Sequence, residues 1–305
     1  MVEVGENVVI LTEKCNQDCI FCSARDVFYR RVDSPREIEE KIFYAKTRIS
    51  FEGGEPTLSG NLLRWVKEAK KQNISEIILC TNGIALADRE YVKDLQGAGI
   101  NLFNINFPSH REDLYRVLTR SYLYKNVITG IENLLSLGPK DIVRLTFVIN
   151  SLNYKTMLWY TRYIEANFPQ IFYIGFNFIK VLGYVKRRTY LVPRLSEVKP
   201  YLLAALEFCR INRVKAMVDG IPLCLMTGYE EYSIDLFKVL NRKYKSFREK
   251  VKTEKCKRCI IRPLCSGLRR DYLKMYGDTE VNPVVGDREF ADYKIRQIVK
   301  KGKLI

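Results

Sequence analysis

The stretch that decides the fold is Cys15-Asn16-Gln17-Asp18-Cys19-Ile20-Phe21-Cys22, which follows a short apolar run at residues 8–11. The apolar run is typical of a buried strand, so we expect the three thiols on a loop at its end. A loop of this kind can wrap an iron–sulfur cluster, in which four cysteines would bind every iron. Three cysteines leave one iron open to a ligand from outside the protein, as in catalytic metal sites.

Two other interpretations of these cysteines are a structural zinc knot and three unrelated core thiols. A zinc knot needs a fourth Cys or His nearby, and none occurs before Cys80. The spacing therefore favours the iron–sulfur interpretation.

Length and composition restrict the class of protein. The chain has 305 residues, enough for one large α/β domain and a small appendage. It is 47% apolar but has no apolar run near the length of a membrane span, and its start lacks a secretory signal pattern. Nine cysteines without such a signal favour metal binding in a reducing compartment over disulfides. We therefore expect a cytoplasmic protein with no membrane partner.

The charge has two interpretations. A net charge of +16 favours an anionic partner, such as nucleic acid or an acidic peptide, but high Lys and Arg content is also typical of thermophile surfaces. Residues 241–262 carry ten Lys or Arg against two acidic residues. That stretch is either a solvated face or a surface that steers an anionic substrate or a reduced electron donor.

Short apolar segments alternate with helical patterns along most of the chain, which predicts a parallel sheet built from βα units. Ser34 and Pro35 mark the start of one helix as N-cap and first helical residue. The predicted strands are 8–12, 48–52, 76–81, 101–107, 141–149 and 172–179.

The second predicted strand runs into Gly53-Gly54-Glu55-Pro56. Two glycines allow the backbone to approach a ligand closely, and the Glu55 carboxylate could meet an ammonium group. Taken alone, this tetrapeptide is only a turn.

The Cys-x3-Cys-x2-Cys spacing with Phe21 before the last cysteine, followed by Gly-Gly-Glu-Pro after a second strand, resembles the radical S-adenosylmethionine (SAM) superfamily. The resemblance implies a partial (β/α)6 TIM-like barrel with a small C-terminal cluster-binding domain. It also implies that Cys15, Cys19 and Cys22 hold a 4Fe–4S cluster whose open iron binds SAM. Gly53, Gly54 and Glu55 would hold the methionyl group. Reductive cleavage of SAM would then give a 5′-deoxyadenosyl radical that abstracts hydrogen from a substrate.

The resemblance also indicates weaker cofactor contacts. Asn106, and less strongly Ser109, follow the fourth predicted strand, whose end contacts SAM in similar enzymes. Leu182 lies in a segment similar to the one against the adenine. Arg144 either binds the SAM carboxylate or forms a barrel-wall ion pair, and both remain open. We interpret Thr81-Asn82-Gly83 as a strand-ending turn and His110 as a surface residue.

Four more cysteines lie near the C-terminus, at Cys224, Cys256, Cys259 and Cys265. Their spacing resembles the twitch or SPASM-like extension, which implies an auxiliary 4Fe–4S cluster, although four thiolates suit zinc as well. We accordingly expect a radical SAM barrel at 1–195 and an auxiliary cluster domain with a C-terminal helix at 196–305. The remaining Cys80 and Cys209 are expected as buried small hydrophobes.

The substrate implied first is a ribosomally made peptide or a protein side chain, because twitch and SPASM enzymes commonly modify these. The first predicted strand begins at residue 8, which leaves no room before it for a peptide-recognition domain. A separate recognition protein would then be needed to bind the peptide. A reduced ferredoxin or flavodoxin-like protein would supply electrons. One alternative is modification of tRNA or a nucleotide, with RNA as a partner. Another is a non-catalytic electron-transfer protein, which would have no need of Gly-Gly-Glu-Pro.

Overall fold

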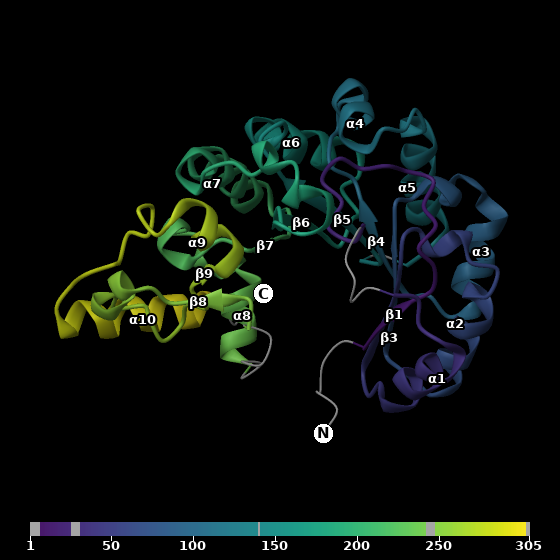
Figure 1. Ribbon diagram of the computed structural model, residues 1–305, viewed down its shortest axis with the longest axis horizontal. Helices are drawn as coiled ribbons and strands as arrows, with labels where there is room; N and C mark the ends of the chain where they lie inside the picture. The colour runs from purple at the N-terminus through teal and green to yellow at the C-terminus, as the bar shows by residue number, and fades with distance from the viewer. Residues whose placement is uncertain (1–6, 26–30, 140, 242–247, 303–305) are drawn as a thin grey trace. The chain divides into compact units, whose positions relative to one another are not determined.

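The computed structural model describes residues 7–25, 31–139, 141–241 and 248–302 (Figure 1). The chain divides into two compact units. The first takes in residues up to 147 together with 163–174 and 182–188, and the second takes in the rest. No helix among the described residues is long and apolar enough to cross a membrane. Six residues of the basic stretch, 242–247, lie outside the described ranges.

A parallel sheet organises the fold and confirms the predicted α/β class. Its seven strands follow one another in chain order, and β1 to β5 pair in parallel. The strands are β1 (Asn7–Ile10), β2 (Arg48–Glu52), β3 (Glu76–Thr81), β4 (Leu102–Asn106), β5 (Val143–Ile149), β6 (Tyr173–Phe178) and β7 (Ala216–Asp219). Six of them were expected, and β7 is an addition, because its four residues are too few for a clear alternating pattern.

Helices follow most strands, as the βα pattern predicts. They are α1 (Pro35–Tyr44), α2 (Leu62–Lys71), α3 (Arg89–Ala98), α4 (Glu112–Thr119), α5 (Tyr124–Leu137), α6 (Met157–Asn167), α7 (Leu195–Asn212), α8 (Ile234–Leu240), α9 (Arg270–Tyr276) and α10 (Arg288–Gly302). Ser34 caps α1 as expected, with Pro35 in the first turn. Helix α7 contains Pro200 in its interior.

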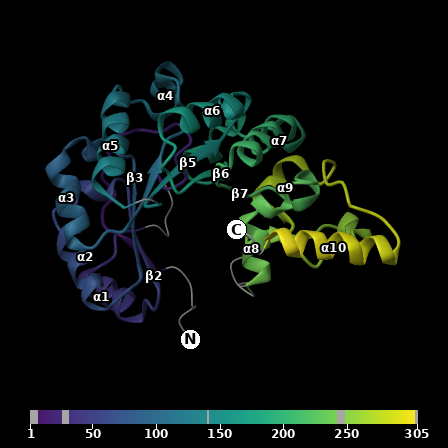
Figure 2. The same cartoon turned by 180° about the vertical axis from the view of Figure 1, so that it is seen from behind.

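The two faces of the sheet differ in chemistry within the first unit. Figures 1 and 2 show α1, α2, α3 and α5 along one face of the strands. The side chains Phe51, Leu79, Phe103 and Ile105 are fully buried. Because side chains alternate along a strand, the residues between them point to the opposite face. Several of those are polar, and they are described with the site below.

The second unit has a core of its own in its C-terminal part. Leu223, Leu236, Ile261, Leu264 and Ile298 form one buried cluster, and Ile298 comes from α10. A two-residue antiparallel pair, β8 (Lys250–Val251) and β9 (Leu268–Arg269), lies in the same region. The C-terminal helix therefore packs on the segment that carries the last four cysteines.

Candidate functional site

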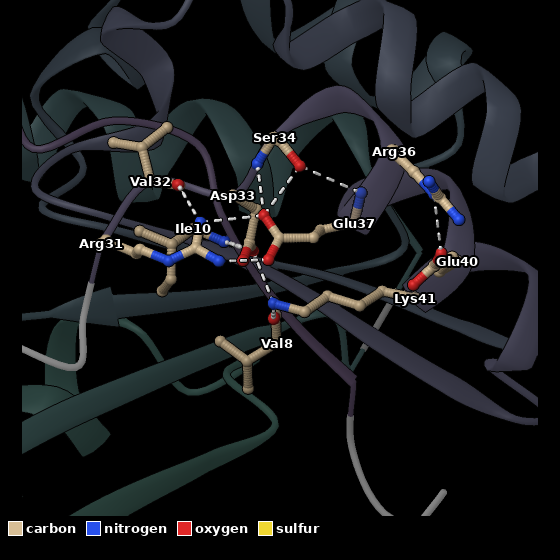
Figure 3. Close-up of polar contacts among 10 residues, drawn as sticks. All are labelled: Val8, Ile10, Arg31, Val32, Asp33, Ser34, Arg36, Glu37, Glu40 and Lys41. Carbon is tan, nitrogen blue, oxygen red and sulfur yellow. Dashed lines mark hydrogen bonds and ion pairs between the residues drawn. The ribbon is translucent and has the colours of Figure 1, made fainter.

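The loop that carries Cys15, Cys19 and Cys22 is closed at its base by Asp33 (Figure 3). The Asp33 amide donates to the Ile10 carbonyl at 2.9 Å, and the Ile10 amide donates to Asp33 Oδ2 at 2.7 Å. Lys41 Nζ, from α1, donates to the same carboxylate oxygen at 2.6 Å and to the Val8 carbonyl at 2.8 Å. These bonds fix both ends of the cysteine loop to β1 and α1.

The far side of the cysteine loop rests on the C-terminal end of α4. The Ile20 amide donates to the Leu118 carbonyl at 2.9 Å, and the Asp18 amide donates to the Thr119 carbonyl at 3.1 Å. The last carbonyls of a helix lack partners within it, so they are free to accept these bonds. Arg120 adds an ion pair to Asp18, 2.7 Å from Nη1 to Oδ2.

A short helix after β6, η4 (Gly183–Lys186), covers the end of the cysteine loop. The Tyr184 amide donates to the Cys22 carbonyl, and Arg188 Nη1 donates to the Ile20 carbonyl, both at 3.1 Å. Gly183 has a φ of +56°, and a Cβ there would lie 2.6 Å from the Cys22 carbonyl oxygen. The predicted adenine segment, with Leu182 as the residue before η4, is thus brought to the cysteine loop.

The Gly-Gly-Glu turn after β2 packs directly on the start of the cysteine loop. The Gly54 amide donates to the Thr12 carbonyl at 2.6 Å, and the Glu55 amide donates to the Lys14 carbonyl at 2.7 Å. A Cβ on Gly53 or Gly54 would collide with the backbone of the loop. The glycines are needed because two backbone segments meet there without room for a side chain.

The Glu55 carboxylate ties this turn to the end of β3. It is 1% exposed and accepts hydrogen bonds from Thr81 Oγ1 and the Asn82 amide, both at 2.7 Å, as well as from Thr57. Burial raises the pKa of Glu55 in spite of these bonds. Asn82 also donates from Nδ2 to Asn16 Oδ1 in the cysteine loop, at 2.6 Å. Thr81 and Asn82 are therefore more than a turn, and sequence reasoning missed their part in holding the loop.

The three thiols of the loop lie close enough to influence one another. Burial, together with the neighbouring Cys22 and Cys15 thiols, raises the pKa of Cys19, and burial raises the pKa of Cys15. The Gln17 amide donates to Cys15 Sγ at 3.4 Å, and the Cys19 thiol lies 3.3 Å from Gln17 Oε1. Three thiols on one short, well-held loop fit a cluster with one open iron.

The side of β2 to β5 opposite the helices carries a line of polar side chains. Ser50 Oγ lies 3.4 Å from Cys80 Sγ, Asn104 Nδ2 lies 3.6 Å from the same sulfur, and Thr146 Oγ1 donates to Asn104 Oδ1 at 2.7 Å. The expectation that Cys80 is a buried hydrophobe is therefore wrong, because it is half-buried among polar groups. Cys209, by contrast, is buried as expected. Asn106 stands two residues beyond Asn104, on the same face.

Arg144 is not brought to the cysteine loop. It pairs in register with Asn104 and lies 3.7 Å from Glu76, the first residue of β3, with its guanidinium 5.4 Å from the Phe172 ring centroid. It therefore lies toward the strand starts, whereas Asn106 ends β4. A role for Arg144 in binding the SAM carboxylate stays a prediction.

Ser109 and His110 serve the turn before α4. Ser109 Oγ donates to the Arg111 carbonyl at 3.0 Å and accepts from the Arg111 amide at 2.9 Å. The His110 carbonyl accepts from Tyr124 Oη at 2.6 Å, and burial lowers the pKa of its imidazole. The imidazole is partly buried rather than the surface group that we expected, and its ring lies 5.6 Å from that of Tyr163.

The second cysteine set lines one cavity in the second unit. Cys224, Cys256, Cys259 and Cys265 all border it, together with Lys252 and Arg262 among others. Burial and the three neighbouring thiols raise the pKa of Cys224 to about 11. Within the described ranges, no three His, Cys, Asp or Glu side chains are arranged as ligands of a metal ion. The four thiols are brought to one place, and their role as cluster ligands stays a prediction.

A buried ionic network supports this second set. Lys250, whose side chain is 3% exposed, pairs with Asp235 and, at 3.2 Å, with Asp219. Ser266, the residue after Cys265, donates from Oγ to Asp235 Oδ2 at 2.7 Å. A buried charge needs such partners, so this network fixes the segment next to Cys265.

A sequence profile for the Radical SAM superfamily matches residues 9–163, about half of the chain. This match spans the cysteine loop, the Gly-Gly-Glu turn and strands β2 to β5. It ends before the second cysteine set.

The curated relatives to which the chain is similar include two kinds of enzyme. A probable GTP 3′,8-cyclase of Methanocaldococcus jannaschii is 27% identical over 229 residues, 72% of this chain and 75% of that protein. A GTP 3′,8-cyclase of Clostridium botulinum is 30% identical over 154 residues, 48% of each chain. A 7,8-dihydro-6-hydroxymethylpterin dimethyltransferase of M. jannaschii is 27% identical over 194 residues, 61% of this chain and 38% of that protein. The chain thus spans about half or less of the last two relatives.

Among solved structures, the FeFe-hydrogenase maturase HydG from Carboxydothermus hydrogenoformans superposes with a TM-score of 0.52. The identity is 14%, and the match covers 97% of this chain and 75% of that one. At this identity the likeness bears on the fold alone.

Proposed function

The chain belongs to the radical SAM superfamily and is a radical SAM enzyme, and we propose that its substrate is a nucleotide or a related fused-ring nitrogen heterocycle. The proposal rests on the similarity of this chain to curated relatives that act on GTP and on a hydroxymethylpterin. Both compounds carry a fused ring with several nitrogen and oxygen atoms. The nucleotide alternative is therefore favoured over the peptide substrate that the sequence suggested first.

The cofactors follow from the family: a 4Fe–4S cluster and SAM. When bound, these two cofactors would supply the reductive cleavage of SAM and, through it, the abstraction of a hydrogen atom from the substrate. In our proposal Cys15, Cys19 and Cys22 hold the cluster. Gly53 and Gly54, which already pack on the loop, would hold the methionyl group.

The remaining contacts of the proposed SAM site come from segments around the cysteine loop. Leu182 is assigned to the adenine and Asn106 to polar contacts, while Phe21 is buried beside the last ligand. Arg144 lies beside Glu76 toward the strand starts, so we take it as a barrel-wall ion pair and not as the partner of the SAM carboxylate. The Glu55 carboxylate is assigned to the methionyl ammonium through Oε2, which accepts one protein hydrogen bond, against three at Oε1. The part played by these residues is to orient SAM and to exclude water from the radical.

The substrate would bind the polar face of β2 to β5. Asn104 and Thr146, which are partly exposed, offer neutral amide and hydroxyl groups that both donate and accept hydrogen bonds. Such groups suit the mixed donor and acceptor edge of a purine or pterin ring. Their own bonds to one another, described above, hold them in place before the substrate arrives.

The second cysteine set is proposed to hold an auxiliary 4Fe–4S cluster in a twitch-like domain that covers residues 196–305. Support comes from the cavity that Cys224, Cys256, Cys259 and Cys265 share. Closed by four thiolates, such a cluster would take part by electron transfer and not by binding substrate to iron. A zinc ion on the same thiols is the competing assignment.

The test is a substrate comparison with anaerobically reconstituted enzyme, SAM and dithionite. GTP, a reduced hydroxymethylpterin and a mixture of short peptides are added in turn, and 5′-deoxyadenosine is measured. We expect one of the two heterocycles to raise its formation about tenfold over SAM alone and to yield a product of altered mass. Stimulation by the peptides alone would contradict the proposal.

A variant on the polar face sharpens this test. Asn104→Ala should remove the stimulation by the heterocycle and leave the slow cleavage of SAM alone within about twofold, because it removes one mixed donor and acceptor group. Asn101→Ala, which changes an amide just before β4 that bonds to Ser75 and Ile77, is the matched control and should keep the stimulation.

A further inference from the structure

We propose that the α4–α5 turn and η4 together form a docking surface for a small acidic protein that donates single electrons. We call it the donor surface; its members are Arg116, Val117, Tyr122, Leu123, Lys125 and Lys186. The inference rests on the proposed function in one respect: the cluster on the cysteine loop must receive an electron from outside. It adds the place on the chain where the expected electron donor docks.

The donor surface surrounds the part of the cysteine loop that is nearest to both elements. Ile20 links them, since its amide donates to the Leu118 carbonyl of α4 and its carbonyl accepts from Arg188, next to η4. Figure 1 shows the loop, in purple, passing beside α4. A partner that sits on these two elements therefore lies over the buried Ile20, one of the two residues between Cys19 and Cys22.

The charge of this region is strongly positive. Residues 111–125 carry four Lys or Arg against two acidic residues, and residues 182–188 carry three against none. The nearby carboxylate of Asp18 is already matched, because Arg120 Nη1 donates a hydrogen bond to its Oδ2 at 2.7 Å. Arg116, Lys125 and Lys186 are exposed, so their positive charge faces solvent.

The centre of the donor surface is apolar. Tyr122 is 79% exposed and Val117 is 53% exposed, and the exposed Leu123 follows Tyr122 in the chain. The Arg116 guanidinium lies 5.3 Å from the centroid of the Tyr122 ring. Aromatic residues and arginine are enriched at the centres of protein interfaces, and a charged rim steers the approach of an opposite charge.

A one-electron donor protein fits these features better than a nucleic acid does. The apolar centre needs an apolar counterpart, whereas a phosphate backbone would leave Val117 and Leu123 without a partner. Electron donation also needs close approach to the cluster, and the basic rim would raise the rate of encounter with an acidic donor. We therefore assign the surface to an acidic donor of the ferredoxin or flavodoxin kind.

The test uses reconstituted enzyme and a recombinant acidic flavodoxin as the probe. The variant is Arg116→Glu with Lys186→Glu, two exposed cations that do not bond to the cysteine loop. The matched control is Lys67→Glu with Lys71→Glu, two exposed cations of α2 and an equal change of net charge. Flavodoxin binding is measured by calorimetry at low and moderate salt, and SAM cleavage is measured with either reduced flavodoxin or dithionite.

We expect the donor-surface variant to bind flavodoxin at least tenfold more weakly than the parent, with a flatter dependence on salt. Its cleavage of SAM should fall with flavodoxin and stay at the parent rate with dithionite. The assignment would be overturned if that variant bound flavodoxin as tightly as the parent, or if the α2 control lost as much affinity. It would also be overturned if neither salt nor charge reversal weakened flavodoxin binding. So would tRNA binding at this surface that flavodoxin does not compete with. Failure of the parent with dithionite would instead count against the proposed function.

Discussion

The two cysteine sets are built in opposite ways. The first places three thiols within eight residues of one loop, and main-chain hydrogen bonds from β1, α4, η4 and the Gly-Gly-Glu turn hold that loop. The second gathers four thiols from 42 residues of chain around a cavity. Buried side chains support this set, among them Lys250, Asp235 and the hydrophobic core that includes Ile261. The first depends on backbone conformation, the second on side-chain packing and ion pairing.

This difference indicates a difference in task. Hydrogen bonds of the main chain hold the first loop, so no fourth side chain is needed to fix it. One iron of a cluster on this loop can therefore stay without a protein ligand. A closed set of four thiols supported by a hydrophobic core suits a site that only passes electrons. Four sets of variants test whether the two cysteine sets differ in support and in task, and their expected effects range from a large loss of activity to a small loss of stability.

The largest effect should follow from removing a thiol of the first set. Cys19→Ala should lower SAM cleavage by at least about a thousandfold, because only three thiolates hold that cluster. The fold should persist, since the loop contributes few core residues. The measurement is 5′-deoxyadenosine formation with dithionite, alongside circular dichroism. Cys209→Ala, a buried cysteine in α7, serves as the control and should keep its activity. Cleavage at the parent rate by Cys19→Ala would make the assignment of the loop wrong.

Removing a thiol of the second set should separate cleavage from product formation. The parent should hold about eight irons per chain, and Cys265→Ala about four. SAM cleavage should continue within about threefold of the parent, whereas turnover of the heterocycle should stop. Metal analysis after anaerobic reconstitution decides between the two metals. Four irons with one zinc in the parent would refute the auxiliary cluster and leave the second set a structural site.

The ionic support of the second set should matter to stability. Lys250→Met leaves the buried Asp235 carboxylate without its cation and removes one cation from the partly exposed Asp219, and we expect the free energy of unfolding to fall by about 3 kcal/mol. Lys180→Met removes a half-exposed partner of Glu249 and should cost less than about 1 kcal/mol. Urea denaturation measures both. Equal costs would mean that the network does not support the segment beside Cys265.

The smallest effect should come from the base of the first loop. Asp33→Asn weakens its hydrogen bonds with the Ile10 amide and Lys41, and we expect a loss of about 1.5 kcal/mol in urea denaturation. Glu40→Gln, which changes an exposed partner of Arg36, should cost less than about 0.5 kcal/mol. If Asp33→Asn instead costs as much as Lys250→Met, the contrast between backbone support and side-chain support is weaker than proposed.

Features that depend on neighbours in the chain could be predicted from the sequence. The Cys-x3-Cys-x2-Cys loop, the glycine pair and the Ser34-Pro35 helix start all lie within a few residues, so their chemistry is visible as spacing. Strands β2 and β3 end where the pattern placed them, because their apolar runs meet polar turns on both sides.

Contacts between distant segments could not be predicted. The bonds from Asn82 to Asn16 and from Arg188 to Ile20 join residues far apart in the chain, and each residue alone is an ordinary polar group. Cys80 was misjudged because a cysteine in a strand is usually a core residue, whereas here its neighbours on β2 and β4 are polar. The seventh strand is too short to show its period.

The bond from Arg188 to the Ile20 carbonyl spans 168 residues. During synthesis the cysteine loop therefore emerges long before the segment that covers it. The Cys22 carbonyl gains its close contact with Gly183 only after that residue has been synthesised. Iron delivery to a nascent chain would meet thiols on a loop that still lacks its bonds to Tyr184 and Arg188. A chain halted at residue 170 should consequently take up iron poorly, measured as absorbance per chain after reconstitution, whereas a completed chain should load fully. We therefore predict that the first cluster is loaded late in biosynthesis, although Cys15, Cys19 and Cys22 precede six of the seven strands of the sheet.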